Sequence, residues 1–328
     1  MPSIDLQVDV TDAVGLGEPA HVAVTVTAPH TLDADPLVCF AKPGAGYSRG
    51  YYTTDLPGPG HGLGSQADWH AARGWVVVAV DHLGVGDSSQ HDPEALTFSR
   101  VVAASQAAES DVRQKLAAGT LMDGLGPVEH AVTIGLGQSM GGSLTIVQQG
   151  RYHCYDGIVT NAPALADAEA TAAADATGVP EPAPDVINAM AWGFHYDDVD
   201  RAVVRRDLED YPARHGDLPA WGSATIPMTV ALWCVSPGSV LTEAAAIRSP
   251  VLVALGERDV LVDPRGELRA YESASSVDYF VCPKMAHMHN FAGTRELLWR
   301  RIETWAAWVR AQCDAVREAD RAGTGTVA

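Results

Sequence analysis

The chain has 328 residues, of which 47% are hydrophobic, so it can bury a substantial core, and its length suggests about two domain-sized units. Lysine and arginine total 22 against 41 aspartate and glutamate residues, a formal net charge of −19 that argues against binding nucleic acid or an anionic membrane surface. No segment reaches the roughly 18 apolar residues of a membrane span, and residues 1–10 lack a basic leader with an apolar signal core, so we predict a cytoplasmic protein.

The beginning of the chain is predicted to form strands of one sheet. Residues 4–10 and 21–27 alternate polar and apolar side chains, which is typical of antiparallel edge strands. Residues 37–41 and 76–80 are short apolar runs, as expected for buried parallel strands. A glycine-rich turn at residues 42–47 follows the first of these runs and can bring backbone close to a substrate.

A serine motif follows the next helix and strand. Residues 95–118 carry apolar side chains at helical spacing, and residues 131–134 form an apolar run rich in β-branched side chains. Directly afterwards, Gly137, Ser139 and Gly141 match G-x-S-x-G, a nucleophile elbow in which a strained strand-to-helix turn exposes the serine hydroxyl. We therefore predict Ser139 as a nucleophile.

Beyond the motif the alternation of strands and helices continues and then breaks. We expect a helix over residues 143–149 that Gly150 ends, and a sixth strand at residues 157–160. The alanine-rich, proline-rich and aromatic pieces that follow predict an inserted cap. The predicted domains are a core formed by residues 1–163 and 250–328, and a cap formed by residues 164–249.

Aromatic and methionine side chains of this insertion could wall an apolar pocket above Ser139. The candidates are Met190, Trp192, Phe194, Tyr196, Trp221, Met228 and Trp233. From them we select Trp192 and Trp221 as substrate contacts, and we add Gly44 and Tyr47 from the turn after the third strand.

Two later strands end in titratable side chains. The apolar run at residues 250–255 opens into a turn that carries Asp259, and another β-like run ends shortly before His287. A serine nucleophile needs an imidazole to take its proton and a carboxylate to orient that imidazole, in the chain order serine, acid, histidine. We predict Asp259 as the acid and His287 as the base, with Asp263 and His289 as alternatives.

His287 and His289 could also be read as a metal pair. Cysteine and acidic companions do not occur nearby at ligand spacing, so we predict no metal site. The five cysteines are odd in number and widely spaced, which predicts reduced core residues.

An acyl-transfer intermediate carries a negative oxygen that backbone N–H groups must stabilise. One donor is predicted to be Met140, the residue after the nucleophile. The other should come from the turn after the third strand, where we favour Ala45 and keep Gly44 and Gly46 as alternatives.

The chain is predicted to close with a long helix. Residues 296–318 form an amphipathic pattern, in which we place Trp299, Trp305 and Trp308 in the core. Residues 319–328 are expected to be a frayed tail.

Together these motifs resemble the α/β-hydrolase superfamily over nearly the whole chain. The resemblance includes D-x-x-G-x-G-x-S at residues 81–88, beside the G-x-S-x-G motif. It implies an α/β fold with a mostly parallel, doubly wound sheet and an inserted helical cap. One departure is Pro43-Gly44, where the superfamily usually has His-Gly before the oxyanion residue. Residues 44–52 and 285–291 are similar to actinobacterial ester and lactone hydrolases, one of which opens the macrolactone of zearalenone.

The sequence therefore predicts a serine hydrolase that cleaves a small hydrophobic ester or lactone through an acyl-enzyme and uses no cofactor. The same triad could also support carbon–carbon bond hydrolysis, acyl transfer or amide cleavage. A non-catalytic ligand receptor is disfavoured because all three triad residue types are present, and a homo-oligomer is left open.

Overall fold

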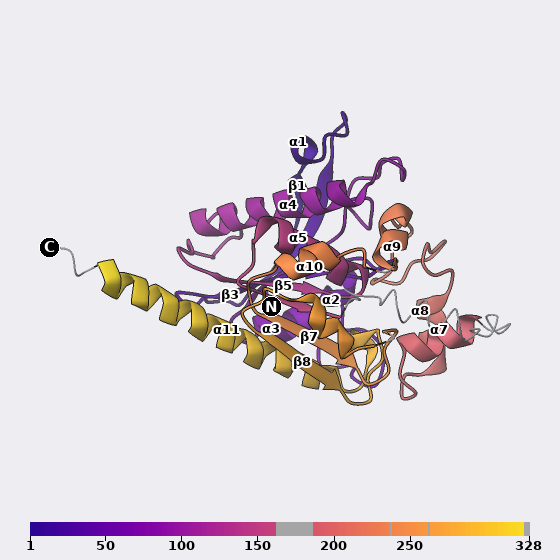
Figure 1. Cartoon of the computed structure of the whole chain (residues 1–328). Helices are drawn as coiled ribbons and strands as arrows, with labels where there is room; N and C mark the ends of the chain where they lie inside the picture. Colours follow the sequence, from indigo (N-terminus) through magenta and orange to yellow (C-terminus); the bar gives the residue numbers. More distant parts are fainter. Residues whose placement is uncertain (162–185, 237, 262, 325–328) are drawn as a thin grey trace.

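The strands form one twisted sheet that runs through the molecule (Figure 1). The computed structural model describes residues 1–161, 186–236, 238–261 and 263–324. Within them the sheet has eight strands in the order β1-β2-β4-β3-β5-β6-β7-β8. Their bounds are β1 Ser3–Asp9, β2 His21–Thr27, β3 Leu37–Lys42, β4 Val76–Val80, β5 Val132–Gly137, β6 Gly157–Thr160, β7 Val251–Gly256 and β8 Val277–Cys282.

Strand direction confirms the predicted, mostly parallel sheet. β2 is antiparallel to both β1 and β4, whereas every pairing from β4 to β8 is parallel. The chain runs from β3 outwards to β4 and then crosses back to place β5 on the other side of β3. Loops after β3 and β5 therefore diverge at a topological switch point, where open α/β sheets form their binding crevice. The register pairs Lys42 with Gly137, so the glycine-rich turn and the serine motif begin side by side.

Helices cover both faces of the sheet, as Figure 1 shows. On one face lie α4, α5, α9 and α10, and on the other lie α3 and α11. The helix bounds are α1 Thr11–Val14, α2 Gly50–Thr53, α3 Gln66–Ala71, α4 Phe98–Ala118, α5 Met140–Tyr152, α7 Val186–Phe194, α8 Arg201–Leu208, α9 Met228–Cys234, α10 Leu241–Ala246 and α11 Arg295–Thr324, with 3₁₀ turns η1 Gly266–Ala270 and η2 His289–Phe291.

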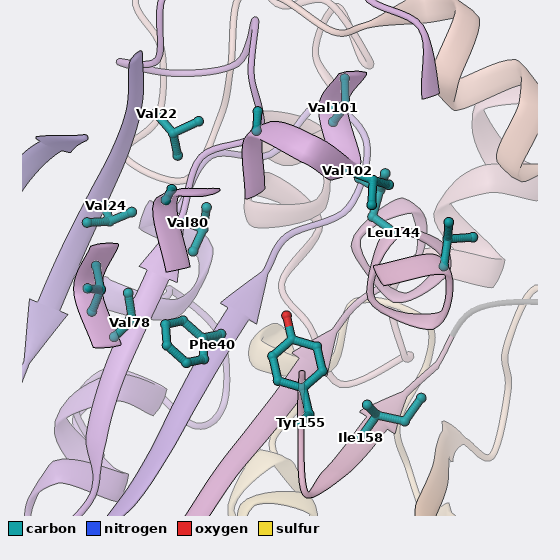
Figure 2. Packing of buried hydrophobic residues seen from close by; sticks show 14 of the residues in the cluster. Val22, Val24, Phe40, Val78, Val80, Val101, Val102, Leu144, Tyr155 and Ile158 are labelled. Carbon is teal, nitrogen blue, oxygen red and sulfur yellow. The ribbon is translucent and has the colours of Figure 1, made fainter. Parts of the chain in front are cut away.

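Aliphatic side chains fill the space between the sheet and its helices. Figure 2 shows Phe40 of β3 and Val78 of β4 facing Val102 of α4 and Leu144 of α5. All of them are at most 1% exposed. Since burying one such side chain contributes about 1.5–3 kcal/mol, this packing holds the strand ends in place.

A charged pair is buried within this packing. Lys42, the last residue of β3, places its Nζ 2.5 Å from Oε1 of Glu109 on α4, and both side chains are fully buried. The hydroxyl of Tyr155 accepts from Lys42 Nζ at 2.7 Å and donates to Glu109 Oε2 at 2.6 Å. Gln148 donates to the same carboxylate at 3.0 Å, so both charges are compensated by several hydrogen bonds.

Three expectations about helices are wrong. Gly150 lies inside α5, which continues to Tyr152. A Cβ at Gly150 would lie 2.4 Å from the backbone oxygen of Glu243, so this glycine permits close packing of α5 against α10 instead of ending the helix.

The last helix continues to Thr324, through much of the predicted frayed tail, and its C-terminal part projects past the sheet (Figure 1). Trp308 is 45% exposed because it lies off the buried face of α11, to which its neighbour Val309 belongs, whereas Trp299 and Trp305 are buried as predicted.

The predicted cap contains helices with different neighbours. Residues 164–185 of it lie outside the described residues. Helices α9 and α10 pack on α5 together with the sheet core, and α7 contacts α8 beside one end of the sheet (Figure 1). The extent of the cap as a domain stays a prediction. In the part of the chain that the structure describes, no helix is both long and apolar enough to cross a bilayer.

Candidate active site

Ser139 sits on a sharp turn between β5 and α5. Its backbone has φ 53° and ψ −123°, a positive φ that is rare for a residue with a side chain. A Cβ at Gly137 would lie 2.4 Å from the backbone oxygen of Gly141, and one at Gly141 would lie 2.2 Å from that of Lys42. Both glycines of the motif are therefore required by close backbone contacts, and the structure forms the predicted elbow.

The side chain of Asn161 is hydrogen-bonded to the backbone of this elbow. It follows β6, and its Oδ1 accepts a hydrogen bond from the Ser139 backbone N–H at 2.8 Å. Its Nδ2 lies 2.8 Å from Nε2 of His289 and 3.4 Å from the backbone oxygen of His287. One buried amide thus connects the serine turn to the histidine loop. Asn161 was not among the predicted site residues, although its place directly after a parallel strand was a usable signal.

Asp259 and His287 form a buried pair. Nδ1 of His287 lies 2.7 Å from Oδ1 of Asp259, and each side chain is at most 2% exposed. Backbone N–H groups of Val260 and Gly256 donate to the two carboxylate oxygens at 2.8 and 3.1 Å. Burial by itself raises the pKa of Asp259, but the charge of His287 and its hydrogen bond outweigh it and hold the pKa well below its ordinary value. The carboxylate therefore stays ionised and can orient the imidazole.

The alternative acid and base lie in different surroundings. Nε2 of His289 is 3.8 Å from Oδ2 of Asp259, too far for a good hydrogen bond, and it is occupied by the amide of Asn161. Burial lowers the pKa of His289 and keeps its ring neutral. Asp263 is half exposed and accepts from the Gly266 N–H at 3.0 Å, as a turn residue does.

The serine turn also contacts the loop that carries His287. Nε2 of Gln138, the residue before Ser139, lies 3.4 Å from the backbone oxygen of His287. The loops that carry the serine, the acid and the base thus meet at one edge of the sheet. Proton transfer between the hydroxyl and the imidazole stays a prediction.

The glycine-rich turn packs directly against the nucleophile. A Cβ at Gly44 would lie 2.2 Å from Oε1 of Gln138 and 3.0 Å from Cβ of Ser139, so a larger residue would require the Gln138 side chain to move. Tyr47 N–H donates to the Gly44 oxygen at 3.2 Å, which closes the turn. Before it, Nε2–H of His82 donates to the oxygen of Pro43 at 2.8 Å.

The predicted oxyanion donors face no competing acceptor within the described residues. Neither Met140 N–H nor Ala45 N–H makes a hydrogen bond there, and the same is true of Gly44 and Gly46. Met140 is the first residue of α5, so its N–H also lies at the positive end of the helix dipole. The choice of Ala45 over its two neighbours stays a prediction.

The three aromatic side chains among the predicted substrate contacts lie in two environments. Tyr47 and Trp221 are 1% and 8% exposed, and both donate to the carboxylate of Asp207, at 2.7 Å each. Trp192 is 59% exposed and stacks under the guanidinium of Arg258 at 4.8 Å. Contact of these side chains with a substrate stays a prediction.

Phe194, at the end of α7, lies next to the predicted base. Its ring centroid is 5.4 Å from that of His287. The backbone oxygens of Gly193 and Phe194 accept from the N–H groups of His287 and Met288, at 3.0 and 2.9 Å. The end of α7 is therefore joined to the histidine loop by its main chain.

The geometry agrees with the comparisons to known proteins. The family described as serine aminopeptidase, S33, matches residues 63–291, which contain all three predicted triad positions. The chain belongs to this family of α/β-hydrolases. The predicted α/β-hydrolase fold is thereby confirmed, and the chain is a member of a serine hydrolase family.

Other relatives of this S33 chain include hydrolases of different kinds. A monoacylglycerol lipase of Mycolicibacterium smegmatis is 28% identical over 211 residues, which cover 63% of this chain and 68% of the lipase. The crystal structure of proline iminopeptidase from Mycobacterium smegmatis has a TM-score of 0.63 at 16% identity, covering 94% of this chain and all of the other. A thermostable carboxyl esterase from Bacillus coagulans has a TM-score of 0.62 at 12% identity and covers 94% of this chain and 99% of its own. The two structures share the fold.

We expect Asp259→Asn to lower kcat on an activated ester by roughly 10³–10⁴-fold, because an amide cannot hold the imidazole in the required tautomer. Asp263→Asn is the matched control and should stay within about twofold, because an amide oxygen still accepts from Gly266. Steady-state kinetics with purified variants provide the measurement. The opposite ranking of the two variants would assign the acid to Asp263.

The buried ring of His82 should make stability depend on pH. Burial lowers its pKa from 6.5 to about 4. Above pH 6.5 the imidazole is neutral in the folded and in the unfolded chain. Between pH 6.5 and about 4 only the unfolded chain takes up the proton. The free energy of unfolding should therefore fall as the pH is lowered through this window, by up to about 3 kcal/mol for this group.

Urea denaturation of the protein and of His82→Gln at about pH 7 and about pH 4.5 measures this effect. The variant should lose less stability between the two conditions than the unmodified protein. His61→Gln, at an exposed position, should behave like the unmodified protein. An equal loss in all three proteins would contradict the assignment to His82.

Proposed function

We propose that this chain is a carboxylic ester hydrolase with Ser139 as nucleophile, His287 as general base and acid, and Asp259 as the orienting carboxylate. The observation that carries the proposal is the 2.7 Å contact between Asp259 and His287, on a loop that adjoins the strained serine elbow. Membership in a serine hydrolase family supports the same reaction.

The reaction proceeds in two halves. Ser139 Oγ attacks the carbonyl carbon while His287 takes the hydroxyl proton, and the N–H groups of Met140 and Ala45 stabilise the oxyanion. Collapse of this intermediate breaks the bond to the alcohol, which receives the proton from His287 and leaves an acyl-enzyme. A water then attacks the acyl carbon, His287 accepts its proton, and the acid departs as Ser139 recovers its hydrogen.

The substrate class is a neutral hydrophobic ester, including a lactone of the zearalenone type. The net charge of −19 disfavours anionic substrates, and aromatic side chains such as Phe194 border the predicted base. The monoacylglycerol lipase relative supports an ester substrate. In a lactone the alcohol remains tethered to the acyl group, so hydrolysis gives one ring-opened product.

Amide cleavage is the second candidate, because the matching family is described as serine aminopeptidase. The same triad attacks an amide, and the difference lies in the leaving group that His287 must protonate. Parallel assays of an ester and of an aminoacyl anilide with a common chromophore separate the two activities. Faster turnover of the anilide would favour the peptidase.

We expect Ser139→Ala to abolish labelling by a fluorophosphonate and to reduce turnover of a chromogenic ester by about a thousandfold or more. Ser143→Ala, at a buried serine one turn further along α5, is the matched control and should keep both properties. Turnover that survives in the Ser139 variant would remove the proposed nucleophile.

We also expect the unmodified protein to convert zearalenone into a single acid heavier by one water, detected by mass spectrometry. Ser139→Ala should leave the lactone intact. Hydrolysis of the chromogenic ester without any conversion of zearalenone would retain the esterase and exclude the macrolactone.

A further inference from the structure

A buried carboxylate on α8 joins several segments of the chain. Asp207 of α8 is fully buried, and its Oδ2 accepts from the Tyr47 hydroxyl at 2.7 Å and from Nε2 of His195 at 2.8 Å. Its Oδ1 accepts from Nε1 of Trp221 at 2.7 Å and lies 3.4 Å from Nη2 of Arg214. These five residues, the Asp207 cluster, come from separate parts of the chain.

Arg214 extends the cluster to the predicted oxyanion turn. Its guanidinium is 2% exposed, donates through Nη2 to the Asp207 backbone oxygen at 2.6 Å, and donates through Nη1 to the backbone oxygen of Gly46. The Ser223 N–H donates to that same oxygen at 3.1 Å. The Gly46 carbonyl is therefore held by two donors.

Fixing this carbonyl also fixes the direction of the neighbouring N–H groups. In a trans peptide the C=O and N–H point in opposite directions, so holding the Gly46 oxygen aims the Tyr47 N–H. The Tyr47 N–H donates to the Gly44 oxygen, and that second peptide carries the Ala45 N–H on its other side. Two peptide units joined by this hydrogen bond thus lead from Arg214 to the predicted oxyanion donor.

The other side of the cluster leads to the predicted base. His195 directly follows Gly193 and Phe194, whose backbone oxygens accept from the loop of His287. The cluster consequently touches both the turn that would bind the oxyanion and the segment that supports the imidazole.

We propose that Arg214, held by Asp207, is a positioning residue that aims the Ala45 N–H at the carbonyl oxygen attacked by Ser139. This inference rests on the proposed function. It adds a residue outside the triad, whose guanidinium donates to the Gly46 oxygen of the turn and also lies over the ring of Tyr47, 4.8 Å from its centroid.

The proposal predicts which kinetic constant changes. Loss of one oxyanion donor acts on the transition state and leaves binding of the ground state unaltered. Arg214→Lys keeps a cation beside Asp207, but a single ammonium cannot reproduce the forked contacts to Asp207 and Gly46. Arg214→Met removes both contacts and leaves Asp207 without its cation, so the lysine variant is the one expected to fold well.

The test compares Arg214→Lys and Arg214→Met with Arg206→Met, whose arginine forms half-exposed ion pairs on α8. Thermal denaturation first establishes which variants are folded. For folded Arg214 variants we expect kcat to fall about 10- to 100-fold with KM within about twofold, and Arg206→Met to match the unmodified protein.

A trifluoromethyl ketone and an ether analogue of the same ester separate positioning from general damage. The ketone forms an oxyanion in the site, so its inhibition constant should rise by the same factor as kcat falls, while that of the ether stays unchanged. An unchanged kcat in folded Arg214→Lys, or equal loss of affinity for ketone and ether, would overturn the inference. Absence of ester turnover and of phosphonate labelling in the unmodified protein would instead refute the proposed function.

Discussion

The strained backbone of Ser139 is the constraint on which the site depends. A left-handed φ at a residue with a side chain costs of order 1 kcal/mol or more, so the surroundings must impose it. Helix α5 is clamped between the sheet and α10, and β5 is held between β3 and β6. Asn161 accepts a hydrogen bond from the Ser139 N–H, and the close backbone contacts at Gly137 and Gly141 exclude other backbone conformations of the turn. The fold thereby supplies the energy that keeps Ser139, which is only partly buried, in this strained conformation.

Much of this arrangement could be predicted from sequence because buried parallel strands have a plain signal. Continuous apolar runs located β4 and β7 to within one residue, and polar residues just beyond β7 and β8 pointed to the sheet edge. Strand order then brings together loops that are far apart in the chain, so Asp259 and His287 could be paired without any knowledge of distances. Ser139 carried its own local motif, which depends on two glycines at fixed spacing.

Buried polar partners could not be predicted in the same way. Asp207 and Arg214 lie in a segment of weak periodicity, and nothing near them in sequence indicates that their charges meet below the surface. Their pairing depends on how α8 and the following loop fold onto the turn after β3. The prediction that Gly150 ends a helix was wrong for a related reason. The role of this glycine is set by its contact with Glu243, a residue nearly a hundred positions away in the sequence. Trp308 lies beside the buried stripe of α11 that contains Trp305 and Val309, so its ring is half exposed although its neighbours on the helix are buried.

The buried pair of Lys42 and Glu109 constrains how this protein can change over evolutionary time. Lys42 ends β3 and is followed at once by the turn that packs on the nucleophile. Losing Glu109 alone would leave the Lys42 ammonium in an apolar interior without its carboxylate partner, which typically costs about 3–5 kcal/mol. Losing Lys42 alone leaves Glu109 paired with the guanidinium of Arg113, whose Nη2 lies 3.3 Å from Oε2. Descendants of this chain should therefore lose Lys42 before Glu109 or together with it, and a sequence that keeps Lys42 without Glu109 would need a compensating change beside Tyr155.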